Sequence, residues 1–230
     1  MSADPALVLV HGAWHGSWCW EALLPELAGV DVQTVELPSV VAPPAGLYAD
    51  AEVLRAAVAA IPEPVVVCAH SYGGAVASQA LAGLPNVTHV VYLCAFALGR
   101  GESVLGADKP PWSRMRDDGF IEVRTPENVF FNDLPEEAAR SAASHLRLQH
   151  SSAFTEQQTE AAWENLPTTY VVCTQDQAIP PQAQRQMAAH IGGKVLEIDT
   201  SHSPFLSQPH VVATILRETL ATNIETAPAP

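Results

Sequence analysis

The stretch that decides the fold of this chain is residues 65–77, which read VVVCAHSYGGAVA. Its first half is a β-branched apolar run, which is typical of a buried strand. Its second half has two glycines followed by small apolar residues, which indicates a helix that starts close against that strand. Ser71 lies on the sharp turn between them, in the pattern small-x-Ser-x-Gly. Such a turn lifts the serine Oγ out of the sheet, so Ser71 is predicted to be a nucleophile.

A serine hydroxyl needs a general base, and the base needs an acid that orients it. In a sheet of this type, the acid and the histidine come later in the chain than the serine. Asp176 follows a strand-like apolar run, and His202 follows the alternating residues 194–199. Ser71, Asp176 and His202 therefore form the predicted catalytic set. Asp199 is the alternative acid, but it lies only three residues before His202 and is expected to end the strand.

An apolar run near the N-terminus leads into the loop HGAWHGSW, residues 11–18. A tetrahedral intermediate needs two N–H donors about 3 Å from its oxygen. The backbone N–H groups of Tyr72 and Ala13 are the predicted donors of this oxyanion hole. His11 and His15 have the i, i+4 spacing of a metal pair on a helix, but the glycine between them indicates a loop. No metal is therefore expected, and the side chain of His11 is expected to brace the loop by a hydrogen bond to the loop backbone.

Three stretches resemble the α/β-hydrolase superfamily, in particular its compact branch of plant methyl-ester esterases, salicylate-esterase-like bacterial hydrolases and hydroxynitrile lyases. They are residues 9–20, 69–74 and 201–209. The resemblance implies a largely parallel sheet of about six strands, a small helical cap and no cofactor, and it makes a homodimer possible. Lyases of this branch carry a threonine in place of Gly12 and a lysine in place of Ser203. The resemblance therefore favours ester hydrolysis over cyanohydrin cleavage.

Strand-like and helix-like runs alternate along the chain. The strand-like runs are residues 7–10, 31–37, 64–70, 89–95, 168–174 and 194–199. The helix-like runs are residues 21–29, 49–60, 74–84, 181–191 and 209–222. This alternation predicts an α/β fold, with a mostly parallel sheet covered by helices on both faces.

The predicted domain organisation is a core with one insertion. Residues 1–98 and 167–222 are assigned to the α/β-hydrolase core. Residues 99–166 are assigned to the cap, with helix-like runs at 134–149 and 155–165. Residues 223–230 are expected to be a disordered tail.

The composition is that of a globular protein, with 230 residues, 48% hydrophobic residues and a formal net charge of −14. A chain this acidic is not expected to bind nucleic acid or anionic membranes. No apolar stretch reaches the roughly 18–20 residues that span a bilayer. The N-terminus has no basic n-region, so no signal peptide and a cytoplasmic location are expected. The four cysteines, of which three lie in strand-like runs, are expected to be buried hydrophobes.

The candidates for the substrate pocket are large apolar residues near the catalytic positions or in the cap: Trp14, Leu98, Trp112, Phe131 and Phe205. An apolar pocket favours an ester with aromatic or aliphatic bulk. Seven basic residues in the stretch 99–150 raise the alternative of an anionic substrate. Nine acidic residues in the same stretch outnumber these basic residues, so the stretch has no net positive charge to attract an anion.

Together these features predict a serine hydrolase that cleaves a small to medium carboxylic ester or lactone through an acyl-enzyme on Ser71, with a small-molecule ester as its partner. One alternative on the same scaffold is a hydroxynitrile-lyase-like or cofactor-free tailoring enzyme, or a thioesterase. Another is a small-molecule receptor that keeps the hydrolase fold and its triad. Substrate turnover separates the enzymes from the receptor.

Overall fold

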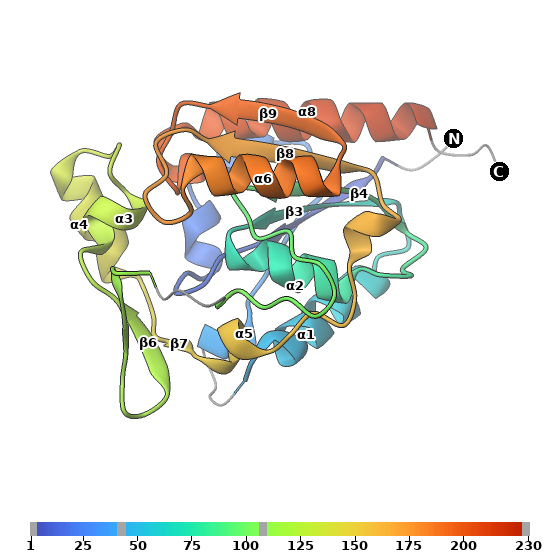
Figure 1. Ribbon diagram of the computed structural model, residues 1–230. Coiled ribbons are helices and arrows are strands. Elements are labelled where there is room, and N and C mark those ends of the chain that lie inside the picture. The colour runs from blue at the N-terminus through green and yellow to red at the C-terminus, as the bar shows by residue number, and fades with distance from the viewer. Residues whose placement is uncertain (1–3, 41–44, 106–109, 227–230) are drawn as a thin grey trace.

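The computed structural model describes residues 4–40, 45–105 and 110–226. At its centre lies a sheet of six strands (Figure 1). The strands lie in the order β2-β1-β3-β4-β8-β9, and every neighbouring pair is parallel. Their bounds are β1 Ala6–Val10, β2 Val32–Val35, β3 Val65–His70, β4 Val87–Leu93, β8 Thr168–Cys173 and β9 Lys194–Ile198. The α/β fold predicted from the alternation of runs is confirmed.

Two apolar clusters lie on the two faces of this sheet. Val8 on β1 and Val67 on β3 are paired in register and belong to one cluster. Their neighbours Leu9 and Cys68 are also paired and belong to the other cluster. Successive side chains of a strand point to opposite faces, and helices cover both faces of a parallel sheet. This is why β1 is apolar at every position and β3 is apolar at every position before His70.

The large helices divide between the two faces. Helices α1 (Leu47–Ala59), α2 (Tyr72–Ala80) and α6 (Pro181–Ile191) contribute to the first cluster, while α8 (Pro209–Thr226) contributes to the second. Figure 1 shows α2 and α6 in front of the strands and α8 behind them. The chain moves from β1 to β2 in one direction and to β3 in the other. The loops after β1 and β3 therefore border a crevice at the carboxyl ends of the strands.

The helix predicted at residues 21–29 is wrong. One short 3₁₀ helix, η2 at Leu24–Leu27, takes its place, and a second, η1 at Ser17–Trp20, precedes it. Pro25 lies in the middle of the predicted helix. It has no N–H to donate, and its ring would clash with the carbonyl four residues earlier.

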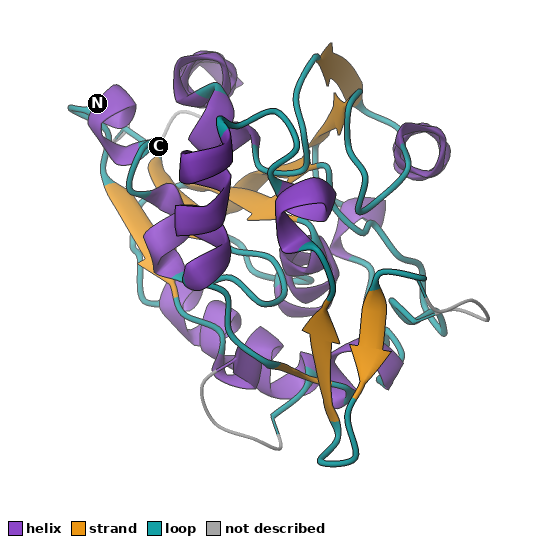
Figure 2. Ribbon diagram, turned by 90° about the vertical axis from the view of Figure 1, so that its left-hand side faces the viewer, coloured by secondary structure: helices purple, strands orange, loops and turns teal. Residues whose placement is uncertain are grey.

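The cap is not purely helical, which corrects the sequence-based expectation. It contains a small antiparallel sheet of β5 (Ser113–Met115), β6 (Phe120–Val123) and β7 (Gln149–His150), part of which is visible in Figure 2. Its helical segments are short: α3 Pro126–Phe130, α4 Glu136–Ser144, α5 Ser152–Thr155 and η4 Ala162–Glu164. The missed signal is the Asp-Gly pair before β6, where Gly119 has a φ of +85°. Such a pair is typical of a turn between two strands.

The C-terminal helix is longer than predicted. Helix α8 runs to Thr226, so the disordered tail expected from residue 223 is wrong as far as residue 226, and residues 227–230 lie outside the described residues. Leu220 and Asn223 are buried, and Asn223 donates to the carbonyl of Thr219, which accounts for the added turn. Within the described residues, no helix is long and apolar enough to cross a membrane.

Candidate active site

Ser71 joins the end of β3 to the start of α2 with a φ of 54° and a ψ of −123°. This conformation costs about 1–3 kcal/mol for a residue that carries a side chain. Three hydrogen bonds hold it. The Ser71 N–H donates to the carbonyl of Leu93 at 3.2 Å, and its carbonyl accepts from the N–H groups of Gly74 and Phe96 at 3.0 Å each. The Ser71 side chain borders a cavity, as a nucleophile on such a turn requires.

Glycines permit a close approach between this turn and the loop after β1. A Cβ on Gly73 would lie 2.7 Å from the carbonyl oxygen of His11, and a Cβ on Gly12 would lie 2.8 Å from the Cβ of Ser71. Neither position has space for a larger residue. The loop backbone can therefore lie beside the serine, where an oxyanion donor is needed.

The structure brings Ser71, His202 and Asp176 together in one chain of hydrogen bonds. His202 Nε2 lies 2.9 Å from Ser71 Oγ, and His202 Nδ1 lies 2.6 Å from Asp176 Oδ2. A carboxylate only accepts, so Nδ1 carries the proton of the neutral imidazole. The Nε2 atom then accepts from the serine hydroxyl. This arrangement can remove the hydroxyl proton as the oxygen attacks a carbonyl carbon.

Asp176 is held by donors on every side. Its Oδ1 accepts from the N–H groups of Ala178 at 2.7 Å and Ile179 at 2.9 Å. Its Oδ2 accepts from Gln184 Nε2 at 2.8 Å as well as from His202. These bonds fix the carboxylate, and the carboxylate in turn fixes the ring of His202. Gln184 on α6 is a supporting residue that sequence reasoning missed.

Asp199, the alternative acid, lies elsewhere. Its Oδ1 accepts from Thr174 Oγ1 and Gln175 Nε2 at 2.8 Å each, and these two bonds lower the pKa of Asp199. It makes no hydrogen bond to His202 within the described part of the chain. Its contacts match the expectation that it ends the last strand.

Two backbone N–H groups beside Ser71 are free to bind an oxyanion. Tyr72 is the first residue of α2, so its N–H has no partner within the helix. Across residues 4–40, 45–105 and 110–226, neither this N–H nor that of Ala13 has a hydrogen-bond acceptor. Both residues line the same cavity as Ser71 and His202.

His11 braces the loop that carries Ala13, as expected. Its Nδ1 donates to the carbonyl of Gly12 at 2.8 Å, while its Nε2 accepts from the N–H of Leu37 at 3.1 Å. The Gly12 carbonyl and the Ala13 N–H belong to one peptide unit. His11 therefore fixes the plane of the peptide that supplies the predicted donor. Burial lowers the pKa of His11, which keeps this ring neutral.

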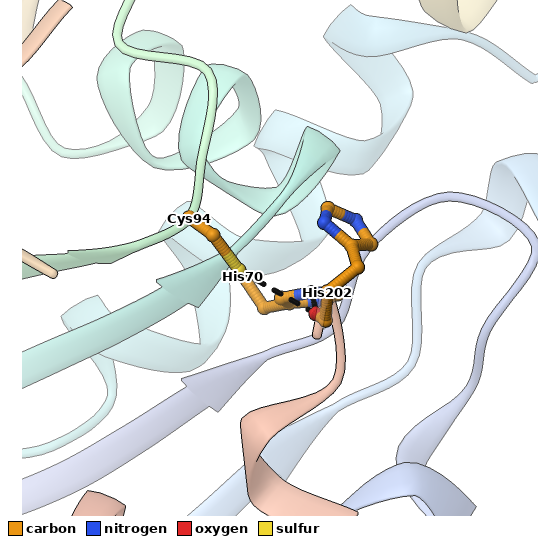
Figure 3. A group of neighbouring side chains, drawn as sticks. All are labelled: His70, Cys94 and His202. Atoms are coloured by element: carbon orange, nitrogen blue, oxygen red, sulfur yellow. Dashed lines mark hydrogen bonds between the residues drawn. The ribbon is translucent and has the colours of Figure 1, made fainter. Parts of the chain in front are cut away.

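His70, Cys94 and His202 form the one group of possible metal ligands found among the described residues, with ligand atoms within 4.8 Å of one another (Figure 3). Apart from His70 Nδ1, which is buried without a hydrogen-bond partner among the described residues, the ligand atoms of this group are already engaged. His70 Nε2 donates to the carbonyl of His202 at 2.8 Å, and Cys94 Sγ donates to the same carbonyl at 3.4 Å. In His202, Nε2 is bonded to Ser71 and Nδ1 to Asp176. The group therefore anchors the backbone of His202.

The cavity beside Ser71 has a volume of about 310 Å³ and lies between the ends of the strands and the cap. Trp14, Leu98 and Trp112 line it, as the sequence predicts, together with Phe130 and Phe154, which sequence reasoning missed. No charged side chain of the described residues lines it other than the titratable His202, and Lys109 lies outside the described residues. The walls therefore suit an apolar, uncharged group.

Phe131 and Phe205 do not line this cavity, which corrects two of the predicted pocket residues. Phe131 follows the end of α3 and is fully buried, with its ring centroid 5.9 Å from that of Phe130. Phe205 belongs to the cluster on the other face of the sheet, 4.8 Å from the ring of Trp20. Proximity in sequence to His202 does not determine which face of the sheet a side chain meets.

A parallel sheet with a serine on the turn after β3, and a histidine and an acid after later strands, defines a class of hydrolytic enzymes. The model of the alpha/beta hydrolase family matches residues 7–215. The chain belongs to this family.

Individual relatives narrow the class. The chain is 29% identical to the alpha/beta hydrolase nvfD of Aspergillus novofumigatus, with 96% of this chain and 98% of the relative covered. It is 26% identical to methylesterase 2 of Arabidopsis thaliana, covering 90% of this chain and 92% of the relative. The crystal structure of polyneuridine aldehyde esterase shares the fold, with a TM-score of 0.79, 23% identity and 94% and 99% of the two chains covered. The resemblance to plant methyl-ester esterases is confirmed, and these relatives support an esterase-type hydrolase.

Proposed function

We propose that this protein is a serine esterase that cleaves a small to medium, uncharged carboxylic ester through an acyl-enzyme on Ser71. The observation that carries the proposal is the chain of hydrogen bonds from Ser71 through His202 to Asp176, beside two free N–H groups. A lactone or thioester presents the same carbonyl to the same groups. The apolar lining of the cavity and the methylesterase relatives favour an ester with an apolar acyl group and a small alcohol.

The proposed reaction has two halves. Ser71 Oγ attacks the ester carbonyl, His202 Nε2 takes the hydroxyl proton, and the N–H groups of Ala13 and Tyr72 bind the oxyanion. His202 then gives that proton to the departing alkoxide, which leaves as an alcohol. A water molecule attacks the acyl-enzyme, with His202 again as the base, and the acid is released.

Intact mass after incubation with a fluorophosphonate tests the nucleophile, with Ser71→Ala as the control. We expect one added phosphonyl group on the wild type and none on the variant. Hydrolysis of p-nitrophenyl butyrate, compared with the mono-p-nitrophenyl ester of succinate, tests the pocket. We expect the uncharged ester to be cleaved at least about tenfold faster, because no lysine or arginine among the described residues lines the cavity to pair with a carboxylate. Equal labelling of Ser71→Ala would refute the mechanism.

A further inference from the structure

A buried chain of polar groups connects the two sides of the candidate oxyanion hole. Asp50 on α1 is at its centre. Its Oδ2 accepts from the hydroxyl of Tyr72 and from Ser39 Oγ at 2.6 Å each, and its Oδ1 accepts from the N–H of Ser39 at 2.9 Å. Ser39 Oγ accepts from Gln149 Nε2 at 2.7 Å, and Gln149 Oε1 accepts from the N–H of Trp14 at 3.2 Å.

Both ends of this chain lie at the oxyanion donors. Tyr72 supplies one donor from its own N–H, and Trp14 follows Ala13, which supplies the other. Trp14 has a φ of 62°, in the left-handed region that residues with side chains avoid. Its carbonyl accepts from the N–H of Arg147 at 2.8 Å, and its ring nitrogen donates to the carbonyl of Ile121 at 2.8 Å. A strained residue beside a donor needs such restraints.

The hydrogen bonds within this chain of polar groups make it rigid. Asp50 is fully buried, and an ionised carboxylate in that position forms short, directional bonds to its donors. Gln149 uses both ends of its amide, so its orientation is fixed by Ser39 on one side and Trp14 on the other. Tyr72 and Trp14 line the cavity, whereas Asp50, Ser39 and Gln149 do not.

We propose that Asp50, Ser39 and Gln149 are positioning residues for the oxyanion hole, which set the spacing between the Tyr72 and Ala13 N–H groups before substrate binds. This inference rests on the proposed esterase function. It assigns these residues no contact with substrate. Their removal reduces the stabilisation of the transition state and leaves substrate binding unchanged.

Two matched pairs of variants test the two ends. Tyr72→Phe removes only the hydroxyl that binds Asp50. Its control, Tyr92→Phe, removes an equally buried hydroxyl that lies 2.9 Å from Ser78 Oγ. We expect Tyr72→Phe to lower kcat for p-nitrophenyl butyrate about tenfold with KM changed less than twofold. We expect Tyr92→Phe to leave both constants within twofold of the wild type.

Gln149→Met removes the amide between Ser39 and Trp14 at similar volume. Its control is Gln158→Met, because Gln158 is also a buried cap glutamine and donates to the carbonyl of Ala75. We expect a loss in kcat only for Gln149→Met. If each test variant matched its control, the positioning role would be overturned. Fluorophosphonate labelling and ester turnover of the wild type test the proposed function on their own. Failure of that function would therefore be detected in the wild type, whereas failure of the positioning role would be detected only in the variants.

A pH profile separates positioning by the Asp50 charge from simple packing. Two titratable groups face Asp50, Tyr72 on α2 and Glu156 directly after α5, while the 3₁₀ helix η3 (Pro38–Val40) presents Ser39. Burial raises the pKa of Asp50 to about 6. We expect the ratio of wild-type to Asp50→Asn kcat/KM to rise between pH 5 and pH 7, since only the wild type gains a carboxylate there. The rest of the site is the same in both proteins, so its own pH dependence cancels in the ratio. A ratio that stays constant would overturn the role of the charge.

Discussion

At the scale of single residues, Ser71 holds a backbone conformation that glycine adopts without strain. Its φ of 54° is paired with a ψ of −123°. We expect Ser71→Gly to unfold at higher urea than Ser71→Ala, by about 1 kcal/mol in the free energy of unfolding, because relief of strain exceeds the added entropy of the unfolded chain. Both variants lack the hydroxyl, so the comparison isolates the backbone. Equal stability would mean that the turn relaxes when the serine is gone.

Asp176 and Asp199 make a second comparison at this scale. Asp176→Asn keeps the shape of the side chain but removes the charge that orients His202, and we expect kcat for p-nitrophenyl butyrate to fall about a thousandfold or more. Asp199→Asn is the matched control, since Asp199 binds Thr174 and Gln175 at the surface. Steady-state kinetics at pH 8 measures both. A large loss in the Asp199 variant alone would mean that the acid is assigned to the wrong residue.

At the scale of elements, α2 lies so close to the end of β4 that Gly74 has no space for a side chain. A Cβ there would lie 2.6 Å from the carbonyl oxygen of Phe96. We expect Gly74→Ala to lower the free energy of unfolding by about 1–3 kcal/mol, because the clash outweighs the helix propensity of alanine. Gly99→Ala is the control, since its nearest contact would be a flexible glutamate at 3.5 Å. Urea titration measures both, and equal midpoints would contradict the close packing.

The elements that the sequence predicts well are those with a local cause. The apolar run before Ser71 and the glycines after it are contiguous, so strand, turn and helix follow from one stretch. The cap was predicted less well because its small sheet pairs β6 with β7, whose partners Ile121 and Gln149 are far apart in the chain. Pairing of that range leaves no periodic pattern in either segment.

At the scale of the whole molecule, Ser71, Asp176 and His202 were predictable because each follows its own strand, and parallel strands bring their ends together. The buried chain of polar groups at the proposed oxyanion hole was not predictable. Ser39 and Gln149 lie 110 positions apart, and neither belongs to a motif. The homodimer suggested by resemblance stays a prediction.

The buried histidines set how the stability of the whole molecule depends on pH. Burial lowers the pKa values of His11 and His70, and that of His15 to about 3. The unfolded chain binds these protons near pH 6.5 and the folded chain does not, so each histidine lowers stability by up to about 1.4 kcal/mol per pH unit below 6.5. The raised pKa of Asp50, about 6, acts in the opposite direction as the pH falls from 6 to 4, but it is a single group.

We therefore expect the urea midpoint to fall steeply between pH 7 and pH 5. His15→Gln should flatten this dependence, because it removes one group that must bind a proton on unfolding. His210→Gln, at an exposed position, is the control and should leave the slope unchanged. A slope that is the same in all three proteins would show that His15 does not contribute to the acid sensitivity of the fold.

The three bonds to Trp14 link parts of the molecule that are easily regarded as separate modules. Arg147, Gln149 and Ile121 all belong to the inserted segment, yet they hold the loop beside Ser71. We therefore expect that exchanging this segment with that of a relative, in order to change selectivity, would also disturb the proposed oxyanion hole. We expect a productive chimera to retain these three attachments.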